Sequence, residues 1–501
     1  MGTFQDELAK LNAAQHQAVD AIDGPVLVIA GPGTGKTQLL GMRVANILQQ
    51  TDVRPDNILC LTFTNKAANN MRERLGRLIG PTAHGVYVRT FHSFAAELMQ
   101  LYPDYFWNGA RLTNVPDEVQ LDIITAILTD LPLDNPLALR FAGRFTVLDD
   151  VKEALKLAKE AGLTPDKLRT LLEVNLQYID LIENDLCDIC TPSLSYKKLA
   201  DFRAQVDALP DQAIDELMRP LKSLSTFMKE SLANALAADE GTNKTARTGK
   251  WKSAMIQTVN GVKGMHDERK RNQWWLAIAD VYQTYRDRLH ERGYFDYADM
   301  IIEVIARLEQ EPDMRAAVQE QFQNVLIDEF QDTNNAQMRL AHLVADHHVN
   351  EGNPNIMAVG DDDQSIFKFN GAELSNMINF RSSYPAAKLI VLTENYRSTQ
   401  AVLDLASGVI AQAEGRVVDS EKDIVKTLQA MAAFDGPGTI ESLVYPTAEH
   451  QYCEVAERIK KRFEAGGSVA VLARGHSSLQ FWPPSSDGST CHCAMSSSRI
   501  S

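Results

Sequence analysis

The chain has 501 residues, a formal net charge of −16 and 45% hydrophobic residues. A chain of this length predicts several domains. The negative charge argues against a protein that simply coats nucleic acid, although an enzyme that acts on nucleic acid needs only a locally basic groove.

Two further features concern the compartment. The chain carries six cysteines, which are too few for a disulfide framework in so long a sequence. No apolar run is long enough to span a bilayer, and the polar N-terminal residues lack the order of a signal peptide. We therefore expect a cytoplasmic protein with no membrane partner.

The first predicted element is a buried strand at residues 25–29, followed by a glycine-rich turn at 30–37 and a helix. This order is typical of a P-loop, in which backbone N–H groups surround a triphosphate. Lys36 can reach the β- and γ-phosphates of ATP, and the Thr37 hydroxyl can bind Mg²⁺. The turn departs from the strict pattern, because Ala30 stands where that pattern opens with glycine. The residues expected around ATP are Gly33, Thr34, Gly35, Lys36, Thr37 and Gln38.

Strands and helices alternate through the first hundred residues. Apolar residues 58–63 predict a second buried strand, residues 66–78 a helix, and residues 86–88 a third strand. Such alternation indicates an α/β fold, with a parallel sheet between layers of helices. Residues 102–294 show helical periodicity with few strand patterns, so we expect a helical insertion there.

The strand pattern returns after this insertion. Buried strands are predicted at 324–327, 356–359 and 389–392. They are followed by a predicted strand at 439–444, a helix at 447–465 and a strand at 469–472. After residue 474 the periodicity ends, which indicates either a disordered tail or a sequence that has left its reading frame.

Two acids follow the strand at 324–327. Asp328 is expected to hold Mg²⁺, and Glu329 to polarise the water that attacks the γ-phosphate. We expect this strand to lie directly beside the P-loop strand. The alternative interpretation of these two acids is an exposed acidic turn. The presence of Lys36 and Thr37 in the same chain favours the catalytic interpretation. After the strand at 356–359, Gln364 is a candidate reporter of the γ-phosphate, with a solvated acidic loop as its alternative.

Eight segments of the chain occur in the order of a known set of helicase motifs. They are residues 11–19, 30–37, 61–68, 90–94, 296–300, 327–334, 360–372 and 393–398. Through these segments the chain resembles the superfamily-one DNA helicases of the UvrD/Rep/PcrA type. The resemblance covers roughly residues 4–474 and implies a RecA-like P-loop core domain, interrupted by a large helical insertion and followed by a partial second RecA-like domain.

The resemblance also implies where these parts begin and end. The expected parts are the first piece of the core domain at 1–101, the helical insertion at 102–294, the second piece of the core domain at 295–390, the partial second RecA-like domain at 391–474, and a disordered or aberrant tail at 475–501.

Roles at the ATP site follow from the same resemblance. Gln15 would read the adenine base, Tyr396 would stack on its face, and Arg397 would contact the γ-phosphate as a fixed cation. The implied catalytic residues are Lys36, Glu329, Gln364 and Arg397.

A second implied surface binds single-stranded DNA. Phe63, Phe367 and Phe369 would stack on bases, which tolerates any sequence because every base has a π-face. Contacts to the sugar–phosphate backbone are implied for Thr64, Thr90 and His92. For each aromatic residue taken alone, packing in a core is the alternative. The implied partners are single-stranded DNA and junctions between single- and double-stranded DNA.

Two departures from the family pattern leave the activity open. Asn370 stands where many relatives carry arginine, and no segments match motifs V and VI, the second of which carries an arginine that completes the γ-phosphate clamp. The first hypothesis is an ATP-dependent DNA helicase or translocase of 3′–5′ polarity. The alternatives are a module that binds ATP and single-stranded DNA without unwinding by itself, and the ATPase part of a helicase–nuclease complex.

Overall fold

The computed structural model describes residues 2–110, 113–141, 144–213, 222–241, 244–365, 375–413, 424–433, 436 and 438–473. Internal contacts separate the chain into two compact units, Met1–Phe434 and Asp435–Ser501. Within the described ranges, none of the helices combines the length and the apolar character needed to cross a membrane.

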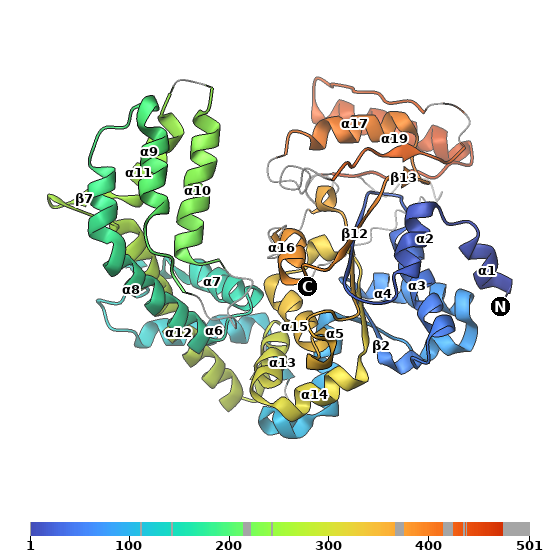
Figure 1. The fold of residues 1–501 in the computed structure, drawn as a ribbon, viewed down its shortest axis with the longest axis horizontal. Coiled ribbons are helices and arrows are strands. Elements are labelled where there is room, and N and C mark those ends of the chain that lie inside the picture. The colour runs from blue at the N-terminus through green and yellow to red at the C-terminus, as the bar shows by residue number, and fades with distance from the viewer. Residues whose placement is uncertain are drawn as a thin grey trace. The chain divides into compact units, whose positions relative to one another are not determined.

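The first unit is built on a six-stranded parallel sheet (Figure 1). Its strands in spatial order are β12 (Lys388–Leu392), β1 (Val26–Ala30), β11 (Ile356–Gly360), β10 (Asn324–Ile327), β2 (Ile58–Thr62) and β3 (Tyr87–Thr90). All residues of β1, β2, β10 and β11 are buried, since helices cover both faces of a parallel sheet. The predicted α/β fold with a parallel sheet is confirmed.

Helices cover the two faces of this sheet in separate groups (Figure 1). One face is covered by α1 (Gly2–Leu8), α2 (Ala13–Asp20), α3 (Lys36–Gln50) and α4 (Asn65–Ile79). The other face is covered by α5 (Phe91–Leu101), α13 (Asp299–Gln310), α14 (Pro312–Gln321), α15 (Asn335–Ala345) and α16 (Ser375–Ser383). Strand β1 serves both layers, because Val26 and Val28 pack into the first and Leu27 and Ile29 into the second.

The sequence predicted that the acidic strand β10 lies directly beside β1, but it does not. Strand β11 pairs with both and separates them. The expectation was wrong because one sequence gives the order of strands along the chain but not across the sheet. The register nevertheless keeps the carboxyl ends level, with Ile29 opposite Gly360 and Ile327 opposite Ala358. Residues that follow these strands therefore still meet at one edge, which is where ligands bind in such sheets.

The region between α5 and α13 is predominantly helical. Its helices are α6 (Asp117–Asp130), α7 (Leu148–Glu160), α8 (Pro165–Cys190), α9 (Leu199–Asp207), α10 (Leu224–Asp239), α11 (Ala246–Met255) and α12 (His266–Glu291). Three short strand pairs accompany them: β4 (Thr113–Asn114) with β9 (Tyr294–Phe295), β5 (Arg140–Phe141) with β6 (Arg144–Phe145), and β7 (Gln257–Val259) with β8 (Val262–Gly264). The β4–β9 pair is parallel, so the chain enters and leaves this region side by side. Its buried apolar side chains form clusters of their own, apart from the two sheet cores.

A buried lysine ties this helical region to the core domain. The Nζ of Lys159, on α7, lies 2.8 Å from Asp296 Oδ2 and 2.9 Å from Asp299 Oδ1. The rings of Tyr282 and Tyr285, on α12, lie 5.7 and 5.0 Å from the same ammonium. The lysine side chain is only 2% exposed, so its ammonium is shielded from water, while the Asp296 side chain is 20% exposed.

A short layer follows β12 in the first unit. Strand β13 (Glu394–Asn395) pairs in parallel with β14 (Gln429–Ala430), and α17 (Gln400–Ile410) lies between them in sequence. On α17, Val402, Leu405 and Val409 are 45%, 53% and 61% exposed.

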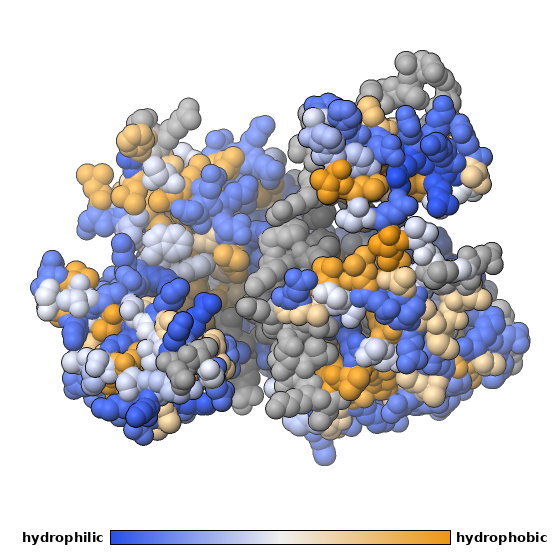
Figure 2. All heavy atoms as spheres, turned by 90° about the horizontal axis from the view of Figure 1, so that it is seen from above, coloured by the Kyte–Doolittle hydropathy of each residue, from blue (hydrophilic) through white to orange (hydrophobic). Residues whose placement is uncertain are grey.

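Hydrophobic side chains also reach the surface in separate patches on the face shown in Figure 2.

The described part of the second unit contains α19 (Ala448–Glu464), close to the helix predicted at 447–465. The strands predicted at 439–444 and 469–472 do not form, and Val444 and Leu472 are each 95% exposed. A strand needs a neighbour that pairs its backbone N–H and C=O groups, and an apolar pattern does not supply one. The predicted tail at 475–501 lies outside the described residues. The predicted domain bounds stay predictions.

Candidate nucleotide-binding site

A glycine turn joins β1 to α3 at the carboxyl edge of the sheet. Gly33 and Gly35 have φ angles of +69° and +87°, in the left-handed region that favours glycine. The Thr34 hydroxyl closes the turn by donating to the Gly31 carbonyl at 2.8 Å. Helix α3 begins at Lys36 directly after the turn, so its unpaired first N–H groups add to those of the turn. This arrangement is suited to an anion.

Lys36 meets Glu329 at this edge. The Lys36 Nζ lies 2.8 Å from Glu329 Oε2, and the lysine side chain is 10% exposed. Glu329 has a φ angle of +51°, a strained value for a non-glycine residue, and it turns the chain sharply after β10. Burial raises the pKa of Glu329, but the charge and hydrogen bond of Lys36, the hydrogen bond from Gln331 and the charge of Arg397 together outweigh burial, so the pKa is lowered overall. The two groups therefore form an ion pair at neutral pH.

Two more acids lie beside this pair, and neither forms an ion pair within the described part of the chain. Burial, and then the charge of Glu329, raise the pKa of Asp328 to about 6. The same two causes raise the pKa of Asp332 to about 7, and its buried Oδ1 has no hydrogen-bond partner among the described residues. These carboxylates and the Thr37 hydroxyl on α3 form a set of hard oxygen donors that fits Mg²⁺.

A hydrogen-bond network connects the ends of β10 and β11. The Gln331 Nε2 donates to Glu329 Oε2 at 2.9 Å, and the Gln331 Oε1 accepts the backbone N–H of Asp361 at 2.8 Å. The Gln364 Nε2 in turn donates to Asp361 Oδ2. Gly360 permits this crossing, because a Cβ at that position would lie 2.8 Å from Gln331 Oε1.

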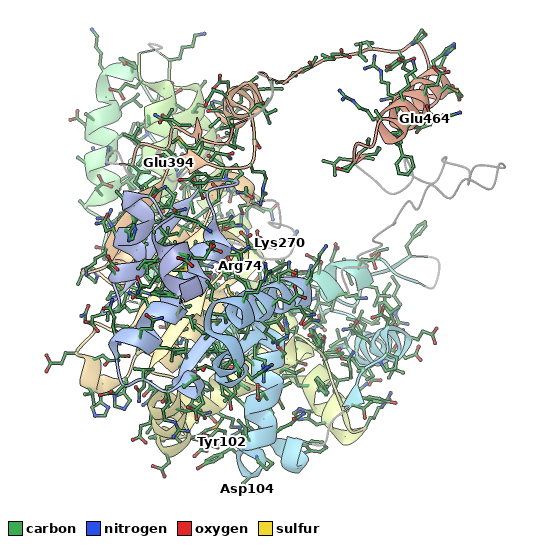
Figure 3. All side chains as sticks on the ribbon, turned by 90° about the vertical axis from the view of Figure 1, so that its right-hand side faces the viewer. Arg74, Tyr102, Asp104, Lys270, Glu394 and Glu464 are labelled. Atoms are coloured by element: carbon green, nitrogen blue, oxygen red, sulfur yellow. The ribbon has the colours of Figure 1, made fainter. Side chains whose placement is uncertain are left out.

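Helix α2 is held against the P-loop. Gln15 is 4% exposed, and its Nε2 donates to the Thr34 carbonyl at 2.9 Å. The Asn12 Nδ2 donates to the Tyr396 hydroxyl at 3.1 Å, and this hydroxyl donates to Glu394 Oε2 at 2.6 Å. Figure 3 labels Glu394, the first residue of β13. Tyr396 is 44% exposed, so part of its ring remains accessible beside the P-loop.

These elements enclose a cavity of about 160 Å³. The residues that line it are Pro32, Gly33, Gly35, Lys36, Thr37, Gln38, Arg74, Glu329, Gln364 and Arg397. The structure thus brings the predicted catalytic residues Lys36, Glu329, Gln364 and Arg397 to one cavity. The lining does not include the predicted residues Gln15, Thr34, Asp328 and Tyr396.

Three residues of this site were missed by the sequence analysis. Arg74, on α4 (Figure 3), lines the cavity and donates to Gln38 Oε1. Asn395 donates through Nδ2 to the Pro32 carbonyl and accepts the backbone N–H of Arg397 at 2.9 Å. The third residue is Gln331, which bridges Glu329 and Asp361. Asn395 and Gln331 lie inside the motif segments 393–398 and 327–334, so those segments were the available signal. No sequence signal pointed to Arg74, because it resembles any charged residue of a surface helix.

The residues predicted to contact DNA follow β2 and β3, which are neighbours at the same edge. Phe63 is half-buried and Thr64 is exposed at the N-terminus of α4. Thr90 is 8% exposed, and its side chain caps α5. Phe367 and Phe369 lie outside the described residues.

His92 makes a ring contact that the sequence did not predict. Its ring is stacked on that of Tyr297, with centroids 4.4 Å apart and an interplanar angle of 16°. Tyr297 is 48% exposed. Burial lowers the pKa of His92 to about 4, so the imidazole is neutral at pH 7.

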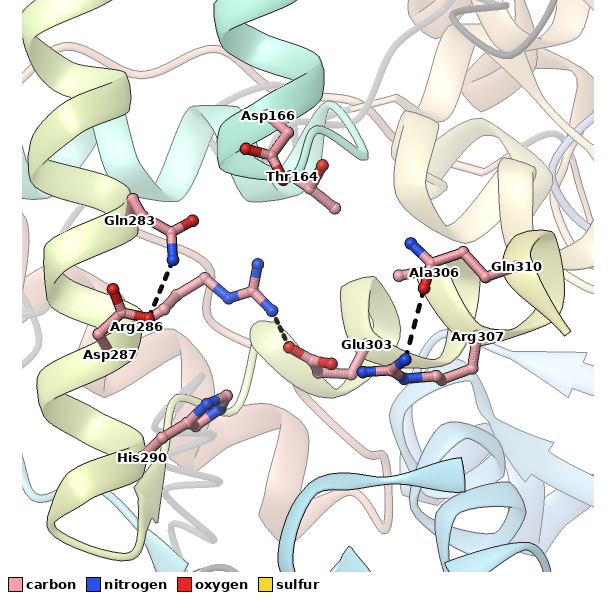
Figure 4. Close-up of a pocket in the computed structure, with 10 residues that line it drawn as sticks. All are labelled: Thr164, Asp166, Gln283, Arg286, Asp287, His290, Glu303, Ala306, Arg307 and Gln310. Atoms are coloured by element: carbon pink, nitrogen blue, oxygen red, sulfur yellow. Dashed lines mark hydrogen bonds and ion pairs between the residues drawn. The ribbon is translucent and has the colours of Figure 1, made fainter. Parts of the chain in front are cut away.

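A second cavity, of about 240 Å³, lies between α12, α13 and the start of α8 (Figure 4). Arg286 is paired with Glu303 across it, and the Gln283 Nε2 donates to Asp287 Oδ1 at 2.9 Å. The carboxylates of Asp166, Asp287 and Glu303 all line this cavity, which disfavours a triphosphate there.

The chain is similar to helicases of one family over most of its length. Residues 11–385 match the family described as the UvrD/REP helicase N-terminal domain. An ATP-dependent DNA helicase PcrA of Bacillus subtilis is 28% identical over 409 residues, a match that covers 82% of this chain and 40% of that protein. The helicases PcrA of Staphylococcus aureus and Staphylococcus epidermidis are each 27% identical, over 403 and 447 residues. These matches cover 80% and 88% of this chain but 40% and 46% of those proteins, so the chain spans less than half the length of these relatives.

Proposed function

The chain belongs to the UvrD/REP helicase family, and from this premise we propose that it hydrolyses ATP to move along single-stranded DNA in the 3′–5′ direction. The observation that carries the proposal is the cavity shared by Lys36, Glu329, Gln364 and Arg397. The chain spans less than half of its relatives, so their whole activity is a proposal for this chain.

The Lys36–Glu329 pair suggests how ATP binding prepares the reaction. A triphosphate carries more negative charge than one carboxylate, so it competes for the Lys36 ammonium. Glu329 would then lose its cation and become a better acceptor for the proton of the attacking water. The left-handed turn at Glu329 and its bond from Gln331 would keep the carboxylate at the cavity.

Magnesium would be held by Thr37 and Asp328. When bound, the ion would neutralise charge on the β- and γ-phosphate oxygens. The buried carboxylates of Asp328 and Asp332, which form no ion pair among the described residues, support this assignment, because a divalent cation would offset their charge.

The other side of the nucleotide would meet residues from two segments. Gln15 and Tyr396 would hold the adenine, and Gln364 and Arg397 would contact the γ-phosphate. Arg397 already lies close to the P-loop, since a Cβ at Gly33 would fall 2.7 Å from the Arg397 Cβ. Nucleotide binding would therefore change the contact between this segment and the core domain.

Single-stranded DNA would pass along the neighbouring part of the sheet edge. Phe63, Phe367 and Phe369 would stack on bases. Thr64, Thr90 and His92 would contact the sugar–phosphate backbone. The proposed DNA substrates include junctions with duplex, and a cytoplasmic location is part of the same proposal.

A second candidate function is a module that binds ATP and single-stranded DNA without unwinding. The exposed apolar side chains of α17 favour it, because the described residues leave this helix partly uncovered. A helicase cycle needs two rigid bodies that close on ATP, and an incompletely covered second body would transmit that closure poorly.

DNA-stimulated ATP hydrolysis is the experiment that tests the proposal. Wild type should hydrolyse ATP faster with single-stranded DNA, and Lys36→Ala should lose nucleotide binding. Glu329→Gln should keep nucleotide binding but lower kcat by about 10² or more, because it removes a general base. Asp134→Asn, in an exposed loop, is a matched control that should behave as wild type.

Two results separate the candidates. Displacement of streptavidin from the 5′ end of an oligonucleotide but not from the 3′ end would support 3′–5′ translocation. ATP and DNA binding without displacement or strand separation would favour the binding module. Absence of nucleotide binding in wild type would refute both.

A further inference from the structure

A second buried lysine lies next to the candidate ATP site. Lys426 precedes β14, and its Nζ contacts Asp361 and lies 2.8 Å from both Asp362 Oδ1 and Asp363 Oδ2. The Lys426 side chain is 2% exposed and that of Asp361 is 0% exposed. The three carboxylates are close enough together for a metal ion, but the ammonium already occupies the position among them.

Asp361 carries this contact to the cavity. One carboxylate oxygen of Asp361 accepts from Lys426, and the other accepts from the Gln364 Nε2. The backbone N–H of Asp361 donates to Gln331, which bonds to Glu329. Lys426 therefore contacts Asp361 directly, and Asp361 in turn holds Gln364, which lines the cavity.

The segment that carries Lys426 also touches the P-loop. A Cβ at Gly31 would lie 2.5 Å from Leu428 Cδ2, so this leucine covers the glycine. The backbone N–H of Gln429 donates to the Thr393 carbonyl at 2.9 Å, next to the segment with Arg397. Lys426 thus belongs to a layer that contacts the nucleotide site at more than one place.

We propose that Lys426 is a positioning residue for the ATP reaction, which holds Asp361 and thereby orients Gln364 toward the γ-phosphate. The inference rests on the proposed function of the cavity as an ATP site. It assigns a task to the layer after β12 that neither Arg397 nor Tyr396 covers: coupling of that layer to the recognition of the terminal phosphate.

The charge state of the group agrees with this role. Burial lowers the pKa of Lys426, but the carboxylates of Asp361 and Asp362 outweigh burial and the pKa is raised overall. The ammonium is therefore charged at neutral pH. Removing it would leave carboxylates that repel one another, and Asp361 would be held less firmly, by the Asp363 N–H and the Gln364 Nε2.

The test compares affinities for two nucleotides that differ at the γ-phosphate. Dissociation constants for ADP and for the non-hydrolysable analogue AMP-PNP, each with Mg²⁺, are measured by competition with a fluorescent nucleotide. Wild type should prefer AMP-PNP. Lys426→Met should reduce that preference about threefold or more, and Gln364→Ala should do the same. The double variant should lose little more than either single variant, because both act on one contact.

Two controls distinguish positioning from loss of stability. Lys426→Arg keeps a cation and should retain most of the preference. Lys159→Met removes a buried lysine of α7 whose ion pairs are with Asp296 and Asp299, outside this network, and should leave the ratio of the two constants unchanged even if the protein is less stable. Should Lys426→Met not fold, Lys426→Gln retains a hydrogen-bond donor and carries the same expectation with a smaller change.

The outcomes separate the two levels of the argument. A folded Lys426→Met or Lys426→Gln with the wild-type ratio overturns the inference. Additive effects of Lys426→Met and Gln364→Ala overturn it as well, and so does a wild type that binds both nucleotides equally. A wild type that binds neither nucleotide instead refutes the proposed function.

Discussion

The cluster around Lys159 and the acids around Lys36 use the same residue types differently. Asp296 and Asp299 both contact the Lys159 ammonium, and two tyrosine rings seal it. At the nucleotide site only Glu329 contacts Lys36, while Asp328 and Asp332 form no ion pair within the described residues. The first cluster is enclosed in packed helices, whereas the second borders a cavity.

The difference indicates which cluster is structural and which is poised for a ligand. A buried charge that already has its partners stabilises the fold it sits in, and removing one partner is strongly destabilising. Buried carboxylates that lack a direct ion-pair partner beside a cavity are retained at a cost to stability, which is typical of functional sites. Removing charge should therefore have opposite effects on stability in the two places.

The largest expected effect is at Lys159. Lys159→Met should lower the free energy of unfolding by about 3–5 kcal/mol at pH 7, because Asp296 and the buried Asp299 lose the ammonium that both contact. The loss should shrink as the pH falls toward 5, since both carboxylates can then be protonated. Urea denaturation followed by tryptophan fluorescence measures it, with Trp274 and Trp275 on α12 as reporters.

The matched control for this prediction is Lys270→Met. Lys270 is exposed on α12 (Figure 3), so its removal should change stability by less than about 0.5 kcal/mol. A Lys159→Met loss as small as that of Lys270→Met would show that the buried cluster does not stabilise the fold.

A smaller effect of the opposite sign is expected at Asp332. Its pKa in the folded state is about 7, above its ordinary value, so the native state binds the proton more tightly than the unfolded state. Stability therefore falls as the pH rises from about 4 to about 7, and the penalty is complete above pH 7. Asp332→Asn should raise the free energy of unfolding by about 1–3 kcal/mol at pH 8 and by little at pH 4.

The measurement is urea denaturation of Asp332→Asn and wild type at both pH values. Asp134→Asn, in an exposed loop, is the control for the loss of a charge and should change neither curve. A destabilised Asp332→Asn at pH 8 would mean that the carboxylate has a cation partner, and the contrast between the two clusters would fail.

Sequence reasoning predicted the parts of this molecule that depend on local order. The turn with Gly33 and Gly35, the presence of a helix directly after it and the membership of a helicase family could be read directly, because adjacent residues specify them. The position of β11 between β1 and β10 could not, since sheet order depends on how distant segments pair. The same holds for Lys426, whose partners lie more than sixty residues earlier in the chain. The two strands expected after residue 438 failed because a strand exists only with a partner.

The smallest expected effect concerns His92, which follows β3 and whose ring is stacked on that of Tyr297. Its pKa is about 4, so at pH 7 the ring is neutral and contributes no charge to a DNA phosphate. His92→Gln should therefore weaken single-stranded DNA binding only through lost ring contact, by roughly 1 kcal/mol. The slope of log affinity against log salt should be unchanged, because that slope counts neutralised phosphates. Lys66→Gln, which removes an exposed ammonium beside Thr64, is the matched comparison and should reduce the slope by about 0.7 if that lysine contacts a phosphate. A reduction of that size in His92→Gln would mean that DNA protonates His92, and the sheet edge would then add a cation that the structure alone does not supply.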